Sequence, residues 1–126
     1  MAEGLAKKLI KEPIQVISRG LSVEEGLGPN SNAVRAMAYH DVNIKAHLSK
    51  QFDVNEVEAS TIVLTMTRRH KEAIRSFYPK IGSQVKTIAE FVGMEGDVKD
   101  PYGQSQACYD GCAKQLKEMI KKMTID

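Results

Sequence analysis

The sequence predicts an α/β protein with three layers, in which helices cover both faces of a parallel sheet. Helical and strand patterns alternate along the chain in the order helix, strand, helix, strand, helix, strand, helix, and such alternation implies right-handed crossovers between parallel strands. The segment 61–67, TIVLTMT, is the most apolar strand pattern in the chain, which is typical of a strand buried on both faces of a sheet. The length of 126 residues indicates one domain over 1–126.

The first half of the chain is predicted to hold two helices and one strand. An amphipathic helix begins at the first residue, because apolar side chains recur at helical spacing at Ala2, Leu5, Ala6, Leu9 and Ile10. Only a methionine precedes this stripe, and methionine is not a capping residue. A short β-branched strand is expected over 14–18, IQVIS, followed by a loop rich in glycine and acid. The second helix is expected over 31–41, with Asn30 and Ser31 as caps.

The second half is predicted to hold two strands and two helices. A turn of helix is expected within 54–60, and the strand over 61–67 is expected near the centre of the sheet. The helix that follows carries its apolar stripe at His70, Ala73, Ile74 and Phe77. The segment 85–92, VKTIAEFV, is expected to be the last strand, and 104–124 the last helix. The inward side chains of that helix are predicted to be Cys108, Cys112, Leu116, Met119, Ile120 and Met123.

Composition and charge narrow the class of protein. The chain has no run of eighteen apolar residues and no secretory signal, so we expect a cytoplasmic protein that does not bind a membrane. A net charge of +2 is too small to argue for nucleic acid, and TRRHK at 67–71 fits the solvated first turn of a helix. The spacing of Cys108 and Cys112 fits neither CxxC redox chemistry nor a zinc site, so we expect thiols rather than a disulfide, and no metal or cofactor.

Three polar residues are candidates for a site. Loops after parallel strands share one rim of the sheet, and ligands bind there. Asp100 precedes Pro101 on a loop that proline stiffens, so its carboxyl group could serve as a general acid. Taken alone, however, Asp-Pro is usually a plain turn. His47 is by itself an ordinary packing or surface residue, and Ser18 an ordinary strand-end hydroxyl, so neither alone indicates a function.

Taken together, these residues resemble those of the low-molecular-weight protein tyrosine phosphatase family. MAEGL at the start resembles the segment that follows the family's signature loop, and VISRGLS at 16–22 resembles its second strand and the next loop. AHLSKQ, IVLTMTRRHK and DVKDPYG resemble later landmarks in the same order. MTRRHK, and Gly103 where eukaryotic members carry a second tyrosine, are similar to the bacterial branch that includes protein arginine phosphatases. The resemblance implies a phosphotyrosine phosphatase I-like fold.

The resemblance also implies roles for individual residues. Asp100 takes the place of the general acid that protonates the leaving group and then activates water. Ser18 and His47 take the places of residues that hold an asparagine of the signature loop, and Pro101 and Tyr102 lie at the rim of the site. The full-length family hydrolyses phosphomonoesters or phosphoramidates, so the implied partner is a phosphorylated protein or a small phosphate ester.

The resemblance begins just after a loop of the form Cys, five residues, Arg, Ser, Pro, which family members reach from an apolar first strand. We therefore expect an N-terminally truncated chain that lacks that central strand, the nucleophilic cysteine and the phosphate-binding arginine. Cys108 and Cys112 are expected on a buried helix face, where neither would serve as the nucleophile. The expectation for this chain is a catalytically inactive phosphatase-family domain.

Other interpretations remain open at this point. The chain could be a non-catalytic interaction scaffold, in which the unpaired edge of 61–67 binds a partner or a second copy as a homo-oligomer. The sheet could instead close by pairing 14–18 with 61–67. An unrelated flavodoxin-like or receiver-like module is a third interpretation. The sequence leaves the choice among phosphotyrosine, phosphoarginine and a small phosphate ester open.

Overall fold

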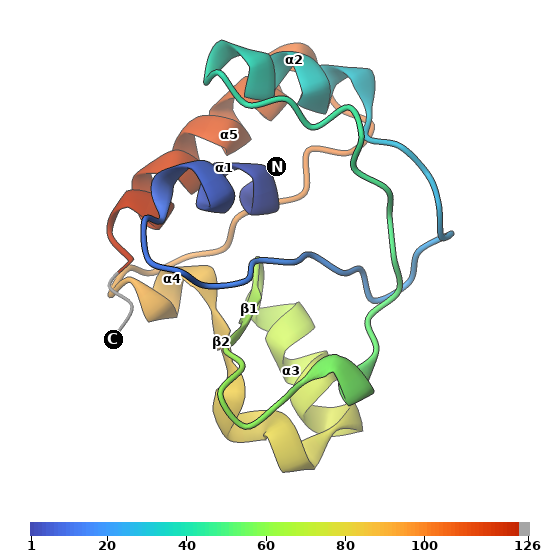
Figure 1. Cartoon of the computed structure of the whole chain (residues 1–126), viewed down its shortest axis with the longest axis vertical. Coiled ribbons are helices and arrows are strands. Elements are labelled where there is room, and N and C mark those ends of the chain that lie inside the picture. Colours follow the sequence, from blue (N-terminus) through green and yellow to red (C-terminus); the bar gives the residue numbers. More distant parts are fainter. Residues whose placement is uncertain (124–126) are drawn as a thin grey trace. The chain divides into compact units, whose positions relative to one another are not determined.

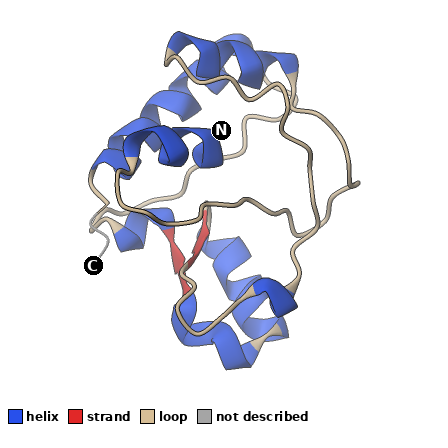
Figure 2. Ribbon diagram, in the orientation of Figure 1, coloured by secondary structure: helices blue, strands red, loops and turns tan. Residues whose placement is uncertain are grey.

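The computed structural model describes residues 1–123, and the chain forms two compact units that are presented separately. The helical unit consists of Met1–Gln51 with the chain from Asp100 onward, and the sheet unit is Phe52–Lys99. Figure 1 labels the elements and Figure 2 distinguishes helix, strand and loop. All the residues to which the sequence assigns a role in the site fall in the helical unit.

The helical unit is built from α1 (Ala2–Leu9), α2 (Ser31–Tyr39) and α5 (Gln106–Lys121). Both α1 and α2 pack against α5 (Figure 1). The buried side chains of these helices are Leu5, Ala6, Ala33, Ala36, Met37, Tyr109, Ala113, Leu116, Met119 and Ile120. The three predicted helices of this unit are therefore confirmed, and their apolar stripes form its interior.

The ends of these helices follow their capping residues. The Asn30 side chain accepts a hydrogen bond from the Asn32 N–H at the start of α2, and Ser105 accepts one from the Cys108 N–H at the start of α5. At α1 the capping position is Met1, which supplies no side-chain hydrogen bond. The acidic residue of the first turn, Glu3, is the feature of α1 that suits its positive end.

The predicted strand at 14–18 is wrong. Residues 14–18 form an irregular segment with no strand partner among the described residues, and the nearest β-bridge joins Gly20 to Gln51. Ile14 and Ile17 are 41% and 46% exposed. A β-branched sequence becomes a strand only where a neighbour completes its hydrogen bonds. Here the Ser18 N–H donates to a carboxylate of α1 instead.

The predicted inward face of the last helix is only partly right. Cys108 is exposed and Cys112 is half-buried, whereas Tyr109 and Ala113 occupy the buried positions. The stripe runs one residue later than predicted in its first two turns, because the ring of Tyr109 buries far more apolar surface than a thiol. Neither cysteine forms a disulfide within residues 1–123, as predicted. The predicted end at Thr124 lies outside the described residues.

The sheet unit contains two parallel strands, β1 (Val63–Thr65) and β2 (Val85–Thr87), in which Val63 lies opposite Val85. Between them come α3 (Arg68–Phe77), which contacts both strands, and the 3₁₀ helix η2 (Pro79–Gln84). The short 3₁₀ helix η1 (Val54–Glu56) confirms the predicted turn, and α4 (Ile88–Phe91) follows β2. Ile74, Ile81 and Val85 form the core cluster, against which Phe52, Val54, Val57, Val63 and Tyr78 pack.

The sheet is smaller than predicted. β1 has three residues rather than the seven of 61–67, and among the described residues it pairs with β2 alone, so the predicted central position is not found. Parallel pairing and the intervening helix are confirmed. In the predicted stripe of α3 only Ile74 is buried, and Phe77 is 79% exposed. No helix within residues 1–123 is long and apolar enough to cross a membrane.

The strand predicted over 85–92 ends at Thr87, because a capping box starts α4 there. The Thr87 hydroxyl accepts from the Glu90 N–H, and the Glu90 carboxylate accepts from the Thr87 N–H, both at 3.0 Å. The Lys71 ammonium of α3 contacts both oxygens of the same carboxylate at 2.8 Å. Thr-x-x-Glu is a sequence signal for a helix start, and here it lies inside an apolar run that otherwise favours a strand.

Two glycines in helices predict opposite responses to the same added methyl group. A Cβ at Gly111 of α5 would meet nothing within 4 Å, whereas one at Gly4 of α1 would come within 2.9 Å of methyl groups of Val42 and Ile44. We expect Gly111→Ala to stabilise the fold by about 0.5–1 kcal/mol through helix propensity. We expect Gly4→Ala to destabilise it by about 1–3 kcal/mol through crowding. Urea unfolding of both variants tests this, and equal effects would contradict it.

The Lys71–Glu90 pair predicts a pH dependence of stability. The hydrogen bond from Lys71 and the one from the Thr87 N–H lower the pKa of Glu90 from 4.5 to about 2. A carboxyl group whose pKa is depressed by folding stabilises the fold fully above its unfolded value and loses that contribution as the pH falls toward the folded one. We therefore expect the melting temperature to fall between pH 4.5 and about 2 more steeply in the wild type than in Glu90→Gln.

Lys71→Met provides the control for this effect. It removes the cation but keeps the apolar stem, so it should flatten the same pH profile, and adding Glu90→Gln to it should change the profile little. A double variant whose two effects simply add would show that the pair is not the cause.

Candidate active site

The Glu3 carboxylate of α1 is the centre of a polar cluster in the helical unit. Its Oε1 accepts hydrogen bonds from the Ser18 N–H at 2.7 Å and from the Ser18 hydroxyl at 3.0 Å. Its Oε2 accepts one from the Lys7 ammonium at 3.1 Å and lies 3.7 Å from Nδ1 of His47. Glu3 thus joins α1 to two loop segments that are far apart in the sequence.

These contacts stabilise the ionised form of Glu3. The side chain is only 18% exposed, and burial alone would raise its pKa. The hydrogen bonds from Lys7 and Ser18, together with the charges of Lys7 and His47, outweigh burial and lower the pKa of Glu3 below its usual range. Glu3 is therefore a carboxylate at neutral pH and acts as an acceptor for its neighbours.

Asp100 lies at the start of a tight turn. Its Oδ1 accepts a hydrogen bond from the Tyr102 N–H at 3.0 Å, and the Pro101 carbonyl accepts one from the Gln104 N–H at 2.9 Å. Gly103 completes the turn with φ of 76°, a conformation that favours glycine. The Asp100 side chain stays exposed while Pro101 is buried beneath it, and Tyr102 is 78% exposed. The turn therefore fixes the backbone and presents the carboxyl group and a phenol ring to solvent.

Asp100 influences two groups of α5 electrostatically. Burial raises the pKa of Tyr109, and the charge of Asp100 adds to that effect. Burial likewise raises the pKa of Cys112, and Asp100 adds to it, while the Met1 amine opposes it. Burial lowers the pKa of the Met1 amine, against the charges of Cys112 and Glu3. The Met1 amine, just before α1, therefore interacts electrostatically with both Cys112 and Glu3.

This arrangement can supply a proton but offers no activated nucleophile. An exposed carboxyl group on a fixed turn can act as a general acid or base. A nucleophilic thiol needs a lowered pKa, whereas the pKa of Cys112 is raised. The sixth residue after Cys108 is Lys114 and the sixth after Cys112 is Glu118, so neither cysteine begins a Cys, five residues, Arg loop.

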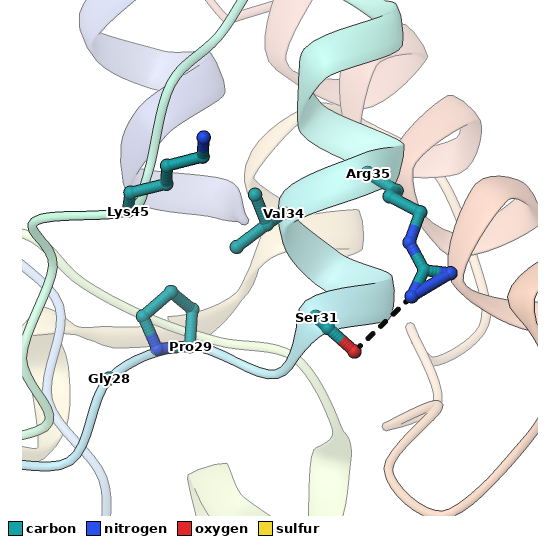
Figure 3. A pocket seen from close by; sticks show the side chains of 6 residues that line it. All are labelled: Gly28, Pro29, Ser31, Val34, Arg35 and Lys45. Carbon is teal, nitrogen blue, oxygen red and sulfur yellow. Dashed lines mark hydrogen bonds between the residues drawn. The ribbon is translucent and has the colours of Figure 1, made fainter.

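One open pocket of the helical unit lies at the N-terminus of α2 (Figure 3). It has a volume of about 420 Å³, and its lining residues are Gly28, Pro29, Ser31, Val34, Arg35 and Lys45. Figure 3 shows Arg35 turned toward the Ser31 hydroxyl, at 3.5 Å, and Lys45 near Val34. None of the residues predicted for the site lines this pocket, so it plays no part in the chemistry above.

Comparison with known proteins identifies the family. The sequence profile of the family described as "Low molecular weight phosphotyrosine protein phosphatase" matches residues 1–125. The chain belongs to this phosphatase family. The predicted resemblance is thereby confirmed, and so is the α/β class with a parallel sheet, since solved phosphatases of the family share the fold.

Individual phosphatases match nearly the whole chain. A low-molecular-weight protein-tyrosine-phosphatase PtpB of Staphylococcus haemolyticus is 31% identical over 98% of this chain and 86% of its own length. A protein-arginine-phosphatase of Bacillus subtilis is 29% identical over 98% of this chain and 84% of its own length. The crystal structure of a phosphatase from T. tengcongensis superimposes with a TM-score of 0.88 at 33% identity, covering 96% of this chain and 85% of that one. The chain thus spans about five-sixths of the length of these phosphatases.

The structure brings the predicted residues into two groups. Ser18 and His47 meet at Glu3, while Asp100, Pro101 and Tyr102 share one turn. Sequence reasoning missed Glu3, because it falls on the polar side of the α1 stripe and reads as a solvated charge. The signal that could have found it is its place within MAEGL, the segment that resembles the residues just after the signature loop.

The Glu3 cluster makes a prediction about stability. Glu3→Ala leaves the Ser18 N–H and hydroxyl without an acceptor, so we expect it to destabilise the fold by about 1–3 kcal/mol. Glu3→Gln keeps a carbonyl oxygen for Ser18 but removes the charge that faces Lys7 and His47, so we expect a smaller loss. Chemical unfolding of both variants measures the difference. Equal losses would show that charge, and not acceptance from Ser18, is what matters.

Proposed function

We propose that this chain is the general-acid part of a low-molecular-weight phosphatase, with Asp100 as the residue that protonates the leaving group and activates water. The observation that carries the proposal is the Asp100 turn, which leaves the carboxyl group exposed above a buried Pro101. Family membership supports it, because DVKDPYG resembles the segment that carries the family's general acid. We also propose that residues 1–126 act as one domain. The cytoplasmic location of the protein stays a prediction.

We further propose that Ser18 and His47 position the phosphate-binding loop and that Tyr102 lines the rim where a substrate ring would lie. Ser18 and His47 are already ordered by Glu3, which supports a positioning role. The substrate class is a phosphorylated protein or a small phosphate ester. Among the relatives, the staphylococcal protein is named a tyrosine phosphatase and the Bacillus subtilis protein an arginine phosphatase.

Hydrolysis by this mechanism needs a nucleophile that the 126 residues do not contain in activated form. The thiolate would attack phosphorus, and backbone N–H groups with an arginine would stabilise the phosphoryl oxygens. Asp100 could then contribute about 10²–10⁴-fold in rate by proton transfer. Without the loop it has no departing group to protonate, so we propose that these residues alone do not turn over a phosphate ester.

Hydrolysis of aryl phosphates tests the proposed acid. We expect no turnover by the chain alone. We expect turnover when the chain is fused behind an apolar strand and a loop of the form Cys, five residues, Arg, Ser, Pro. In the fusion, Asp100→Asn should reduce kcat/KM, and more so for phenyl phosphate than for p-nitrophenyl phosphate, because the poorer leaving group depends more on protonation.

Two outcomes would count against this assignment. Turnover by the unfused chain that Asp100→Ala abolishes would mean that a nucleophile exists within these residues. Equal losses of kcat/KM for the two esters in Asp100→Asn would mean that Asp100 shapes the site without donating the proton. Circular dichroism of each variant controls for folding.

A second candidate function is an interaction scaffold, and one observation favours it. Among the described residues β1 pairs with β2 alone, which leaves its other edge open, and Ile14 and Ile17 are partly exposed on an unpaired segment. An unpaired edge is a template for strand addition. We propose that this edge would bind a partner strand or a second copy. Light scattering over a dilution series distinguishes the candidates, since a concentration-independent monomer counts against self-association.

A further inference from the structure

A groove between α2 and α5 of the helical unit has a different character from the candidate active site. Its volume is about 540 Å³, and its lining residues are Ala36, Tyr39 and His40 of the α2 end and Asp110, Gly111, Lys114, Lys117, Glu118 and Lys121 of α5. The two helices pack against each other beneath it. No residue predicted for phosphate chemistry lines the groove.

The groove carries an unbalanced row of cations. Lys114, Lys117 and Lys121 follow one another at helical spacing along a single face of α5. None of the three makes an ion pair or hydrogen bond with another residue in the described part of the chain. The two acids in the groove are Glu118 and Asp110, which accepts a hydrogen bond from Gln106 at 2.9 Å, so the lysines outnumber the acids by one. The row therefore offers three ammonium groups to an external anion.

The aromatic end of the groove is exposed to solvent. Tyr39 is 85% exposed, and its ring meets the His40 ring edge to face at a centroid separation of 5.2 Å. Burial lowers the pKa of His40, and the charges of Lys117 and Lys8 add to that effect against those of Asp110 and Asp41. An exposed ring beside cations suits a partner that combines carboxylates with an apolar side chain.

The groove is open at Gly111, so a segment of another polypeptide could approach α5 there. A Cβ on Gly111 would meet nothing within 4 Å, so no side chain fills the groove at that point. The lysine stems and the Tyr39 ring line its sides. This shape accommodates an extended segment better than a single ion, because the three cations are spread along the helix axis.

From this charge complementarity we propose that the α2–α5 groove docks an acidic segment of a partner protein, with its carboxylates on Lys114, Lys117 and Lys121 and an apolar side chain against Tyr39. This surface is separate from the Asp100 turn and does not depend on phosphatase activity. Each exposed ion pair contributes little binding free energy by itself. We therefore expect the three lysines to strengthen binding together with the Tyr39 ring and to speed association.

Fluorescence anisotropy with a labelled peptide of glutamates around a central leucine tests the proposal on the full chain. We expect Lys114→Gln/Lys117→Gln/Lys121→Gln to weaken binding by about tenfold or more. The matched control, Lys45→Gln/Lys80→Gln/Lys86→Gln, removes the same charge from exposed lysines elsewhere and should change affinity by less than about twofold. Tyr39→Ala should weaken binding without changing the charge. Thermal melts confirm that each variant folds.

Several results would overturn the proposal. Equal losses in the groove and control variants would mean diffuse attraction rather than docking, as would unchanged binding in Tyr39→Ala. Absence of wild-type binding at low salt, or equal binding of a peptide with glutamine in place of glutamate, would also overturn it. Loss of binding to anionic phosphatidylserine vesicles in the groove variant, with no peptide binding, would assign the groove to a lipid surface instead.

Discussion

In the helical unit, one partly buried carboxylate links α1 to two loop segments. Glu3 accepts from the Ser18 backbone and hydroxyl and faces both Lys7 and His47. A helix of eight residues is marginal by itself, so the position of α1 depends on this carboxylate and on the burial of Leu5. The same contact orders two loops, because one side chain satisfies groups from both. If the Glu3 side chain were removed, Ser18, Lys7 and His47 would all lose a partner.

The Asp100 turn holds its carboxyl group in place and also leaves it accessible, and a proton donor would need both properties. Burial would fix it but would hinder contact with a substrate, while an open loop would leave it mobile. Here Pro101 is buried and the Tyr102 N–H is bonded to the carboxyl group, whose side chain stays exposed. The backbone of the turn gives the carboxyl group a fixed position, and the exposure of the side chain makes it accessible. The Asp100 carboxyl group is therefore placed by its own turn, which suits the general-acid role proposed for it.

The sequence predicted helices better than strands, and the reason is physical. The stripes of α1, α2 and the second half of α5 and the cap at Asn30 are local, so they could be recognised without knowing what they pack against. A strand needs a neighbour, and 14–18 has the composition of a strand without a partner in the described residues. Residues 88–91 were missed because the Thr87–Glu90 capping box is hidden in an apolar run. The Asp100 turn could be predicted because Asp-Pro-Tyr-Gly is local, whereas the meeting of Ser18 and His47 at Glu3 depends on tertiary packing.

The electrostatics around Cys112 explain why an acid of this kind cannot simply recruit a nearby thiol. Burial raises the pKa of Cys112; the Met1 amine opposes this, and the smaller effect of the Asp100 charge adds to it. An ionised carboxylate near a thiol thus adds slightly to the effect of burial in disfavouring the thiolate that would attack phosphorus. A phosphatase of this type needs an independent source of positive potential for its nucleophile, and an arginine with a cradle of backbone N–H groups provides one. In the part of the chain that the structure describes, three lysines line the α2–α5 groove, and we propose that a nucleophile acting with Asp100 would need a loop that carries its own positive field.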